Sequence, residues 1–510
     1  MSKVLIGVDI GTTGCKTVAL DEHGDPVATN MIEYPLYSDK PGWSEQDPHD
    51  WWAAAKTGVS GIVKALGDAS VVGIGLSGQM HGLVALDSAG EPLRRAILWN
   101  DQRCSQECDD ITSELGGLDS LISLTNNRML PGFTGGKLRW VRDHQPSVFS
   151  KLASVCLPKD YIRFRLTGVL ATDESDASGT GYFDPRTRTW VPEVFEACGG
   201  TVSMLPQVFG SSEKTGAVLD SVAEELGLPP GIPVYGGGGD SVIQTTSMGI
   251  LALGDVGITL GTAGIVAATA DFCPENLEAR VQISAGNSAT AWHIMGVSLA
   301  AAGAFQWLGE MVAQFAEAAQ PDFVKLSALA EAAPIGSAGL LFLPYLNGER
   351  SPHIAPDARG AFVGLTRAHK AEHLARSVIE GVVFNLRRIL EELERMGVPC
   401  RRIVASGGAS RSPLWLQILA DVCDREVVTL EGSGEGGALG AALAAGVGAG
   451  VWEDYQSFFA GARETARFEP NLNSASRYKD IYEVHMKLYE QLRTVDKGVN
   501  SLEPAEIEST

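Results

Sequence analysis

Residues 7–16 read GVDIGTTGCK, a strand-like run that passes through Gly11, Thr12 and Thr13 into Gly14 and Lys16. The apolar segment that leads into it, residues 3–10, alternates little and is rich in valine and isoleucine, which is typical of a buried strand. A tight turn of this composition leaves successive backbone N–H groups unpaired beside a hydroxyl group, and such a nest binds phosphate oxygens. The alternative is an ordinary β-hairpin turn without a ligand.

The same pattern returns about half a chain later. Residues 259–264 read TLGTAG, again a strand-like run that ends in a Gly-Thr turn. A repeat at this distance predicts a duplicated domain, with a boundary near residues 245–255. If the two copies are related by an approximate two-fold axis, both turns face one cleft and can bind different phosphates of a nucleotide. The residues expected to do so are Gly11, Thr12, Thr13, Lys16, Gly261 and Thr262.

Strands and helices alternate along the rest of the chain, which predicts an α/β fold. A length of 510 residues predicts two or three domains. Further strands are expected at residues 71–76, 256–260 and 402–405, and helices at residues 48–66, 133–143, 297–315 and 371–395. Residues 436–451 are mostly glycine and alanine, which indicates a closely packed internal helix too short to span a bilayer.

A run of four glycines, residues 236–239, ends in Asp240. The glycines allow a ligand or another segment to approach the backbone closely, and the carboxylate then projects from the end of a strand. Such a carboxylate suits a general base that takes the proton of a hydroxyl group during phosphoryl transfer. The alternative is a helix N-cap, a position that aspartate favours. With two phosphate turns in the same chain, the general base is the favoured interpretation.

Two segments of the first half carry the side chains expected around a polyhydroxylated ligand. Residues 77–82 read SGQMHG and residues 99–103 read WNDQR. Amide, imidazole, carboxylate and guanidinium groups beside an indole can pair with buried hydroxyl groups, which need hydrogen-bond partners. Taken alone, His81 could equally be a core histidine whose hydrogen bonds are satisfied within the protein.

Charge and cysteine usage restrict the partners. The chain has 62 acidic against 40 basic residues, a formal net charge of −22. Nucleic acids and anionic membranes require a basic surface, so neither is expected as a partner. The eight cysteines show no paired spacing and the N-terminus carries no signal-peptide core. We therefore predict free thiols and a cytoplasmic location.

Three further patterns match known sites only in part. Gly432, Gly434 and Gly437 have the spacing of a dinucleotide fingerprint, but no acidic residue follows at the end of a second strand. His369 and His373 have the helical spacing of zinc ligands but lack the glutamate of the zinc-binding motif. Residues 132–137 resemble a Walker A loop, but Leu138 stands where serine or threonine is needed. None of the three predicts the function.

Together these segments resemble the FGGY family of carbohydrate kinases, over roughly residues 4–489. The resemblance rests on residues 7–16, 43–48 with the following Trp51 and Trp52, 132–141, 360–365 and 373–380. The segments at 78–82, 97–101 and 157–161 are most similar to those of family members that phosphorylate xylulose. Two departures are small: Ala263 stands where serine is common, and Ser241 stands where asparagine or glutamine is usual.

The resemblance implies two actin-like, ribonuclease-H-type domains that flank a central cleft. It divides the chain into residues 1–248 with the sugar site, the first phosphate loop and the base, residues 249–489 with the second phosphate loop and the adenosine site, and a polar tail at 490–510. It also implies that Mg·ATP phosphorylates the terminal hydroxyl of D-xylulose. By position it assigns Asp240 as catalytic base, Asp9 and Asp240 to Mg²⁺, Gly303, Gln306, Gly408, Ala409 and Ser412 to the nucleotide, and Gln79, Met80, His81, Trp99, Asn100, Asp101 and Asp240 to the sugar.

Alternatives remain at this point. The same fold could serve a kinase for ribulose, another ketose or a polyol. An actin-like ATP-binding protein would share the phosphate turns without a sugar site, and an oxidoreductase would use the glycines that begin at Gly432. The sequence leaves open whether the chain forms a homodimer.

Overall fold

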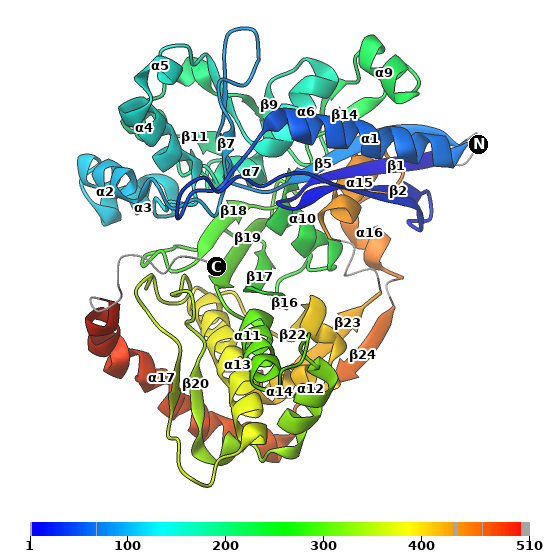
Figure 1. Cartoon of the computed structure of the whole chain (residues 1–510). Coiled ribbons are helices and arrows are strands. Elements are labelled where there is room, and N and C mark those ends of the chain that lie inside the picture. Colours follow the sequence, from blue (N-terminus) through cyan, green and yellow to red (C-terminus); the bar gives the residue numbers. More distant parts are fainter. Residues whose placement is uncertain (1–2, 68, 432–435, 462, 501–510) are drawn as a thin grey trace.

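The computed structural model describes residues 3–67, 69–431, 436–461 and 463–500 as two α/β halves, one above the other in Figure 1. Each half is built on a seven-stranded sheet. The strands of the N-terminal half are β1 (Lys3–Ile10), β2 (Gly14–Asp21), β3 (Pro26–Glu33), β5 (Ser70–Gly78), β13 (Lys214–Ala217), β14 (Pro233–Tyr235) and β15 (Gly238–Gly239). Those of the C-terminal half are β16 (Asp255–Leu260), β17 (Gly264–Ala270), β18 (Gln282–Ala285), β19 (Trp292–Ser298), β22 (Arg402–Ser406), β23 (Glu426–Leu430) and β24 (Glu464–Phe468).

The two sheets share a strand order. In the first, β1 pairs antiparallel with β2, which pairs with β3, and β1 pairs parallel with β5 on its other side. In the second, β16 pairs antiparallel with β17, which pairs with β19, and β16 pairs parallel with β22. Each Gly-Thr turn joins the first two strands of its sheet. The repeat inferred from the two turns is therefore present in the topology.

Helices cover both sheets. The larger ones are α1 (Pro48–Leu66), α4 (Thr134–His144), α6 (Pro158–Thr167), α10 (Asp240–Ser247), α11 (Ala302–Phe315), α12 (Phe323–Ala332), α13 (Ala371–Arg395), α14 (Pro413–Cys423), α15 (Gly437–Gly448) and α17 (Leu472–Asn500). Helix α1 starts where the Asp47 side chain accepts a hydrogen bond from His49 N, and proline occupies the first helical position. The long helix α13 places one apolar stripe in the core of the C-terminal half.

Smaller elements complete the two halves. The short helices are α2 (Ser105–Glu114), α3 (Leu118–Thr125), α5 (Pro146–Phe149), α7 (Glu174–Ser178), α8 (Pro192–Ala197), α9 (Asp220–Leu226) and α16 (Tyr455–Phe459). The short strands are β4 (Glu45–Gln46), β6 (Val84–Leu86), β7 (Ala96–Ile97), β8 (Ser154–Cys156), β9 (Ala171–Asp173), β10 (Phe183–Asp184), β11 (Thr189–Trp190), β12 (Gln207–Phe209), β20 (Leu341–Leu343) and β21 (Ala361–Val363).

Two sequence predictions need correction at an element end. The helix expected at 297–315 begins only at Ala302, because Val297 and Ser298 belong to β19 and pair with β17. The polar tail expected from residue 490 is helical as far as Asn500, as part of α17. The helices expected at 48–66 and 371–395 have the predicted bounds.

Helix α15 belongs to the second half of the chain but packs against the sheet of the first, which Figure 1 shows as an orange helix beside blue strands. Two strand glycines make this approach possible. A Cβ atom on Gly7 would lie 1.9 Å from Ala438 O, and one on Gly75 would lie 1.8 Å from Ala441 O. The expected internal, closely packed helix is confirmed. Among the described residues, no helix is long and apolar enough to cross a membrane.

The halves are also joined on another side, where α3 ends. The Asn127 side chain donates from Nδ2 to Ile283 O at 2.8 Å, and Ile283 N donates to Asn127 Oδ1 at 2.9 Å. One amide side chain thus satisfies a backbone N–H and a backbone C=O of the other half. Asn126 makes a similar bond to Pro274 O at 2.9 Å. All eight cysteines are free thiols, as predicted.

Candidate active site

Both Gly-Thr turns keep their threonine side chains accessible. Gly11 N donates to Gly14 O at 3.1 Å, and Gly261 N donates to Ala263 O at 3.1 Å, so the first glycine N–H closes each turn, although the second turn is one residue shorter. Thr13 and Thr262 are exposed. Their geometry suits the phosphate nests that the sequence predicts.

The first turn is held from behind by amide and aromatic side chains. Gln46 Nε2 donates to Thr12 O at 2.7 Å, and Trp99 Nε1 donates to Thr12 Oγ1 at 3.0 Å. Gln79 is completely buried and donates from Nε2 to Gln46 Oε1 at 2.8 Å. The structure therefore places Gln79 behind the phosphate turn, and its expected contact with the sugar stays a prediction.

Asp9 and Asp240 come together where two strands of the first sheet end. Gly238 and Gly239 pair with the last two residues of β5, the neighbour of β1, on which Asp9 lies. Asp240 is the first residue of α10, and the N-cap position falls on Gly239 without a capping side chain. The N-cap alternative for Asp240 is therefore wrong. Its Oδ1 accepts a hydrogen bond from Ser241 N at 2.7 Å.

Both carboxylates lie in an environment that disfavours their charge. Burial raises the pKa of Asp240 to about 7, with a further contribution from the negative charge of Asp9. Burial also raises the pKa of Asp9, against the opposing influence of Lys16, its cross-strand neighbour. Asp9 Oδ1 is buried without a hydrogen-bond partner, and a Cβ atom on Gly437 would lie 2.7 Å from this carboxylate. The pair can thus accept a proton or hold a cation.

A buried ionic cluster, which the sequence analysis missed, supports the glycine run below Asp240. Lys159 Nζ lies 2.6 Å from Asp160 Oδ1, 2.8 Å from Asp173 Oδ1 and 3.1 Å from Asp176 Oδ2, and all four side chains are fully buried. Ser175 connects the cluster to the base, because its Oγ donates to Asp173 and accepts from Gly239 N at 3.1 Å. The signal available in the sequence was the charged Lys159-Asp160 pair inside an apolar segment.

Met80 and His81 line the site beside Asp240. Met80 is buried against the glycine run, since a Cβ atom on Gly239 would lie 2.5 Å from Met80 Cγ. The His81 ring stacks on Phe133 with centroids 4.7 Å apart, and its Nδ1 lies 2.7 Å from Gly179 O. Burial lowers the pKa of His81 to about 3, so the imidazole is neutral. With the Nδ1 proton directed at the carbonyl, Nε2 remains a hydrogen-bond acceptor.

The residues of the 99–103 segment have separate positions. Trp99 is 36% exposed and Asn100 is exposed, so both are accessible to a ligand. Asp101 is completely buried, where it accepts a hydrogen bond from Ser44 N at 2.6 Å and pairs with Arg103 at 2.7 Å. Asp101 therefore supports this loop through Ser44 and Arg103, and its expected contact with the sugar stays a prediction.

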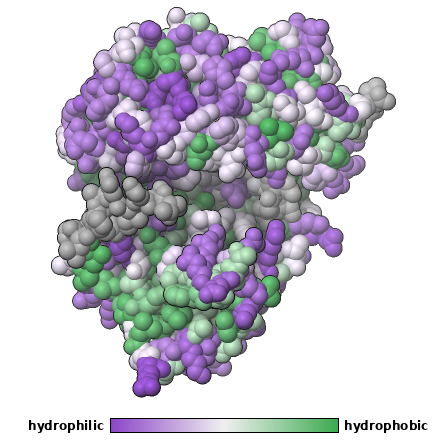
Figure 2. Space-filling model, in the orientation of Figure 1, coloured by the Kyte–Doolittle hydropathy of each residue, from purple (hydrophilic) through white to green (hydrophobic). Residues whose placement is uncertain are grey.

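A cavity of about 1120 Å³ lies in the C-terminal half beside the second turn. Six of the predicted nucleotide residues line it: Gly261, Thr262, Gln306, Gly408, Ala409 and Ser412. Gly303 lies under the turn, because its N–H donates to Thr262 O at 3.2 Å. The opposite wall was not predicted from the sequence. Helix α12 forms it with Phe323, Val324, Ser327 and Glu331. Figure 2 shows hydrophobic residues gathered on this lower half. Such walls suit a planar aromatic base.

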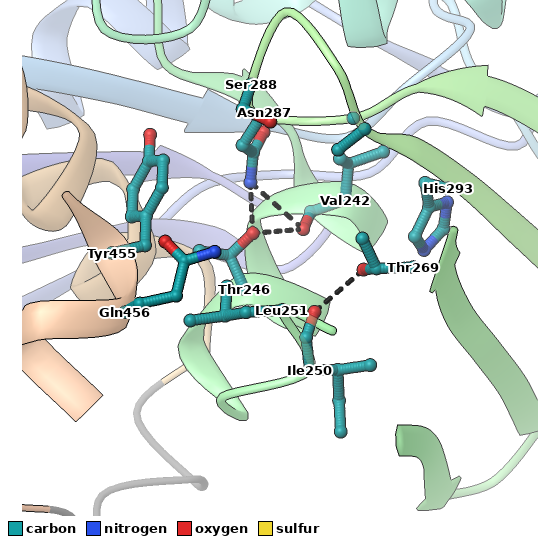
Figure 3. Close-up of a pocket in the computed structure, with 12 residues that line it drawn as sticks. Val242, Thr246, Ile250, Leu251, Thr269, Asn287, Ser288, His293, Tyr455 and Gln456 are labelled. Atoms are coloured by element: carbon teal, nitrogen blue, oxygen red, sulfur yellow. Dashed lines mark hydrogen bonds between the residues drawn. The ribbon is translucent and has the colours of Figure 1, made fainter. Parts of the chain in front are cut away.

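A second, much smaller pocket of about 40 Å³ lies behind α10 (Figure 3). Thr246 of α10, Asn287 and His293 of the C-terminal half and Tyr455 of α16 line it. Asn287 Nδ2 donates to Thr246 Oγ1, and burial lowers the pKa of His293 to about 4. The volume suffices for a few water molecules only. This pocket is therefore a small polar gap in the contact between the two halves.

The partial patterns have structural explanations where the structure describes them. Lys137 is buried and donates to His81 O at 2.8 Å and to Gly132 O at 2.6 Å, so it fixes two loops. The His369 and His373 rings lie 5.4 Å apart, and the described residues contain no group of three or more potential metal ligands. Gly432 and Gly434 lie outside the described residues.

Comparison with known proteins agrees with this arrangement. The family model of the FGGY family of carbohydrate kinases, N-terminal domain, matches residues 4–247, and that of the C-terminal domain matches residues 256–449. A xylulose kinase of Bacillus subtilis is 34% identical over 504 residues, which cover 98% of this chain and 99% of the relative. A xylulose kinase of Escherichia coli is 37% identical over 437 residues, which cover 85% and 87%.

Solved structures show the same two-domain fold. A xyloylose kinase from Brucella ovis superposes with a TM-score of 0.91 at 32% identity, over 96% of this chain and all of the other. A gluconate kinase from Lactobacillus acidophilus gives 0.90 at 28% identity, over 96% and 98%. The non-enzymatic and oxidoreductase alternatives are thereby set aside. This chain belongs to the FGGY family of carbohydrate kinases, two-domain enzymes of actin-like fold that phosphorylate small sugars with ATP.

Proposed function

We propose that the protein transfers the γ-phosphoryl group of ATP to the terminal hydroxyl of D-xylulose and releases D-xylulose 5-phosphate and ADP. The observation that carries the proposal is the Asp240 carboxylate, which lies beside Met80 and His81 with a pKa of about 7. Support for the substrate comes from the curated relatives, which are xylulose kinases over nearly their whole length.

Asp240 is the general base of this proposal. Its carboxylate accepts the proton of the sugar hydroxyl while that oxygen forms a bond to the γ-phosphorus and the bond to the leaving ADP oxygen breaks. A base with a pKa near the working pH combines a large ionised fraction with sufficient basicity. The buried Lys159 cluster fixes the backbone from which the base projects.

ATP extends across the seam between the halves in this proposal. The adenosine part occupies the 1120 Å³ cavity, and the two Gly-Thr turns contact the phosphates through backbone N–H groups and threonine hydroxyls. Lys16 adds positive charge beside the first turn. This arrangement lets a chain with a net charge of −22 bind an anionic substrate.

Mg²⁺ fits the acidic end of the site. Asp9 and Asp240 would hold it, because Asp9 Oδ1 is buried without a partner and both side chains supply the oxygen ligands that Mg²⁺ prefers. The ion would neutralise charge that develops on the transferred phosphate.

The cytoplasmic location and the division of the chain near residue 248 remain predictions.

The test is a screen for ADP release with pentuloses and polyols. D-xylulose should give the highest kcat/KM, and a clear preference for ribulose or a polyol would replace it as the substrate. Asp240→Asn should lower kcat roughly 100- to 10,000-fold while ATP still binds. Asp220→Asn, the same substitution at the exposed first residue of α9, is the matched control and should keep the activity. Substantial turnover by Asp240→Asn would contradict the role of the base.

A further inference from the structure

Arg350 belongs to the C-terminal half, on the loop between β20 and β21, and its side chain faces the N-terminal half at Gly132. Ser351 N donates to Val297 O of β19 at 3.0 Å, which anchors this loop to the second sheet. The preceding residue, Glu349, is almost completely buried. Arg350 therefore projects from a well-fixed segment.

Glu349 does not neutralise its neighbour. Its carboxylate accepts hydrogen bonds from Leu299 N at 2.9 Å, Arg350 N at 2.8 Å, Ser298 Oγ at 2.9 Å and Asn385 Nδ2 at 2.7 Å. All four donors are neutral, and they use both carboxylate oxygens. The Glu349 side chain thus fixes the backbone of Arg350. Its negative charge does not pair with the Arg350 guanidinium group.

The guanidinium group of Arg350 reaches residues of the N-terminal half. A Cβ atom on Gly132 would lie 3.0 Å from Arg350 Nη2 and 2.9 Å from Trp99 O. The positive charge of Arg350 also contributes to the lowered pKa of His81. Trp99 and His81 are two of the residues expected to contact the sugar. Arg350 is thus the nearby cation that the other half supplies to this part of the site.

Within the part of the chain that the structure describes, no carboxylate pairs with the Arg350 guanidinium and no hydrogen bond from it is formed. Its pKa falls to about 10, and burial is the cause. Arg350 is partly exposed, and a ligand oxygen that accepts hydrogen bonds from a partly desolvated cation recovers part of the desolvation cost. Arg350 therefore has donors available for a ligand.

The position of Arg350 indicates which part of the sugar it meets. Asp240 adjoins Met80 through the glycine run. Arg350 lies at Gly132, whose carbonyl accepts a hydrogen bond from the same Lys137 ammonium group as the carbonyl of the next residue, His81. An open-chain pentulose with its terminal hydroxyl on Asp240 extends past Met80 toward His81. The opposite end of such a ketose carries the carbonyl group at C2.

We propose that Arg350 is a sugar-binding residue that donates hydrogen bonds to the carbonyl oxygen of the ketose, across the seam between the halves. The inference rests on the proposed function. A guanidinium group only donates and a carbonyl oxygen only accepts, so the two match. A hydroxyl at C2 would bring a proton of its own and a different geometry. Arg350 thus favours ketoses over the corresponding pentitols.

The experiment compares D-xylulose with the pentitols that differ from it only by a hydroxyl at C2. In Arg350→Met, KM for D-xylulose should rise roughly 10- to 100-fold, as expected for loss of a hydrogen bond to a charged group. The pentitols should be much less affected, so the ketose-to-pentitol ratio of kcat/KM should fall. KM for ATP should stay unchanged. An unchanged ratio would overturn the inference.

Two further variants keep the result interpretable. Arg350→Lys retains the charge but loses the planar fork, and it should show the same fall in the ratio if Arg350→Met does not fold. Arg280→Met is the matched control, because Arg280 lies nearby but is paired with Glu278 at 2.5 Å and Glu392 at 3.0 Å. It should leave the ratio unchanged. Wild-type protein without activity on any pentulose would refute the proposed function itself, a result separate from an unchanged ratio.

Discussion

Lys159 is a buried cation that contacts three carboxylates, and its removal would leave Asp160 with Arg163 at 3.3 Å while Asp173 and Asp176 lose their lysine contact. In Lys159→Met, Asp160, Asp173 and Asp176 would face one another in a dehydrated site. Breaking a buried ionic group by removing one partner typically costs about 3–5 kcal/mol. We expect the free energy of unfolding in urea to fall by about that amount. Lys151→Met on the surface is the control, and a loss as small as in the control would show that the cluster contributes little.

Gly75 is a position where one methyl group should matter. A Cβ atom there would lie 1.8 Å from Ala441 O, so Gly75→Ala forces α15 away from the first sheet. Overpacking of this kind costs about 1–3 kcal/mol, and more where backbone must move. Thermal unfolding should show a clearly lowered midpoint. Gly461→Ala, where a Cβ atom would meet no other atom within 4 Å, should be nearly neutral.

Single residues also show where sequence reasoning reached its limit. The predicted segments came together, but Gln79, Asp101 and Gly303 support the ligand-facing residues beside them. Neighbours in one segment point in different directions, and their composition does not reveal which of them faces the cavity. Arg350, which we propose to contact the ketose, was missed for another reason, because its loop belongs to the other half of the chain.

At the scale of elements, local patterns predicted helices well and one helix start poorly. The helices at 48–66 and 371–395 carry clear apolar stripes, so their bounds could be predicted. Val297 and Ser298 continue an apolar pattern into α11, but they pair with Ile265 and Gly264 of β17. That pairing joins residues far apart in sequence, which a local pattern cannot show.

Helix α17 should make stability depend on pH through His485. Its Nε2 lies 2.9 Å from Phe342 O, and burial lowers its pKa to about 4 from the usual 6.5. The unfolded chain therefore binds a proton that the folded protein rejects, and stability is lost as pH falls from about 6.5 to 4. His485→Gln should remove up to about 1.4 kcal/mol per pH unit of this loss.

Urea unfolding at pH 7 and pH 5 measures this difference. His23→Gln, at an exposed position, serves as the control and should retain the wild-type pH dependence. An equal loss of stability in wild type and His485→Gln between these two pH values would show that His485 does not contribute.

For the whole molecule, the seam at Asn127 should couple the two halves. Asn127→Ala would leave the N–H and C=O of Ile283 unpaired in a buried place, at about 1–3 kcal/mol for each group. Calorimetry should show a lower midpoint and a broader transition, because the halves lose part of their connection. Asn473→Ala on the surface is the control, and identical traces for the two variants would exclude a role for this seam.

The duplicated plan was visible in the sequence because each half repeats one short turn after one strand. The connections between the halves were not visible in the sequence, because they join residues that are distant in the chain. Asn127 bonds to Ile283, and α15 packs against β1 and β5. Chemistry at the ends of strands could thus be predicted, while the way in which the halves hold each other could not.

The position of α15 also bears on how the protein is made. The strands of the first sheet have all been synthesised once β15 is made, but the helix that covers one face of this sheet begins only at Gly437. At ordinary translation rates the growing chain carries that bare face on the ribosome for roughly 10 to 40 seconds after residue 248 has been added. The first half therefore reaches its final packing only when the second half is nearly finished. We expect chaperones to bind the exposed apolar face of the nascent chain in that interval.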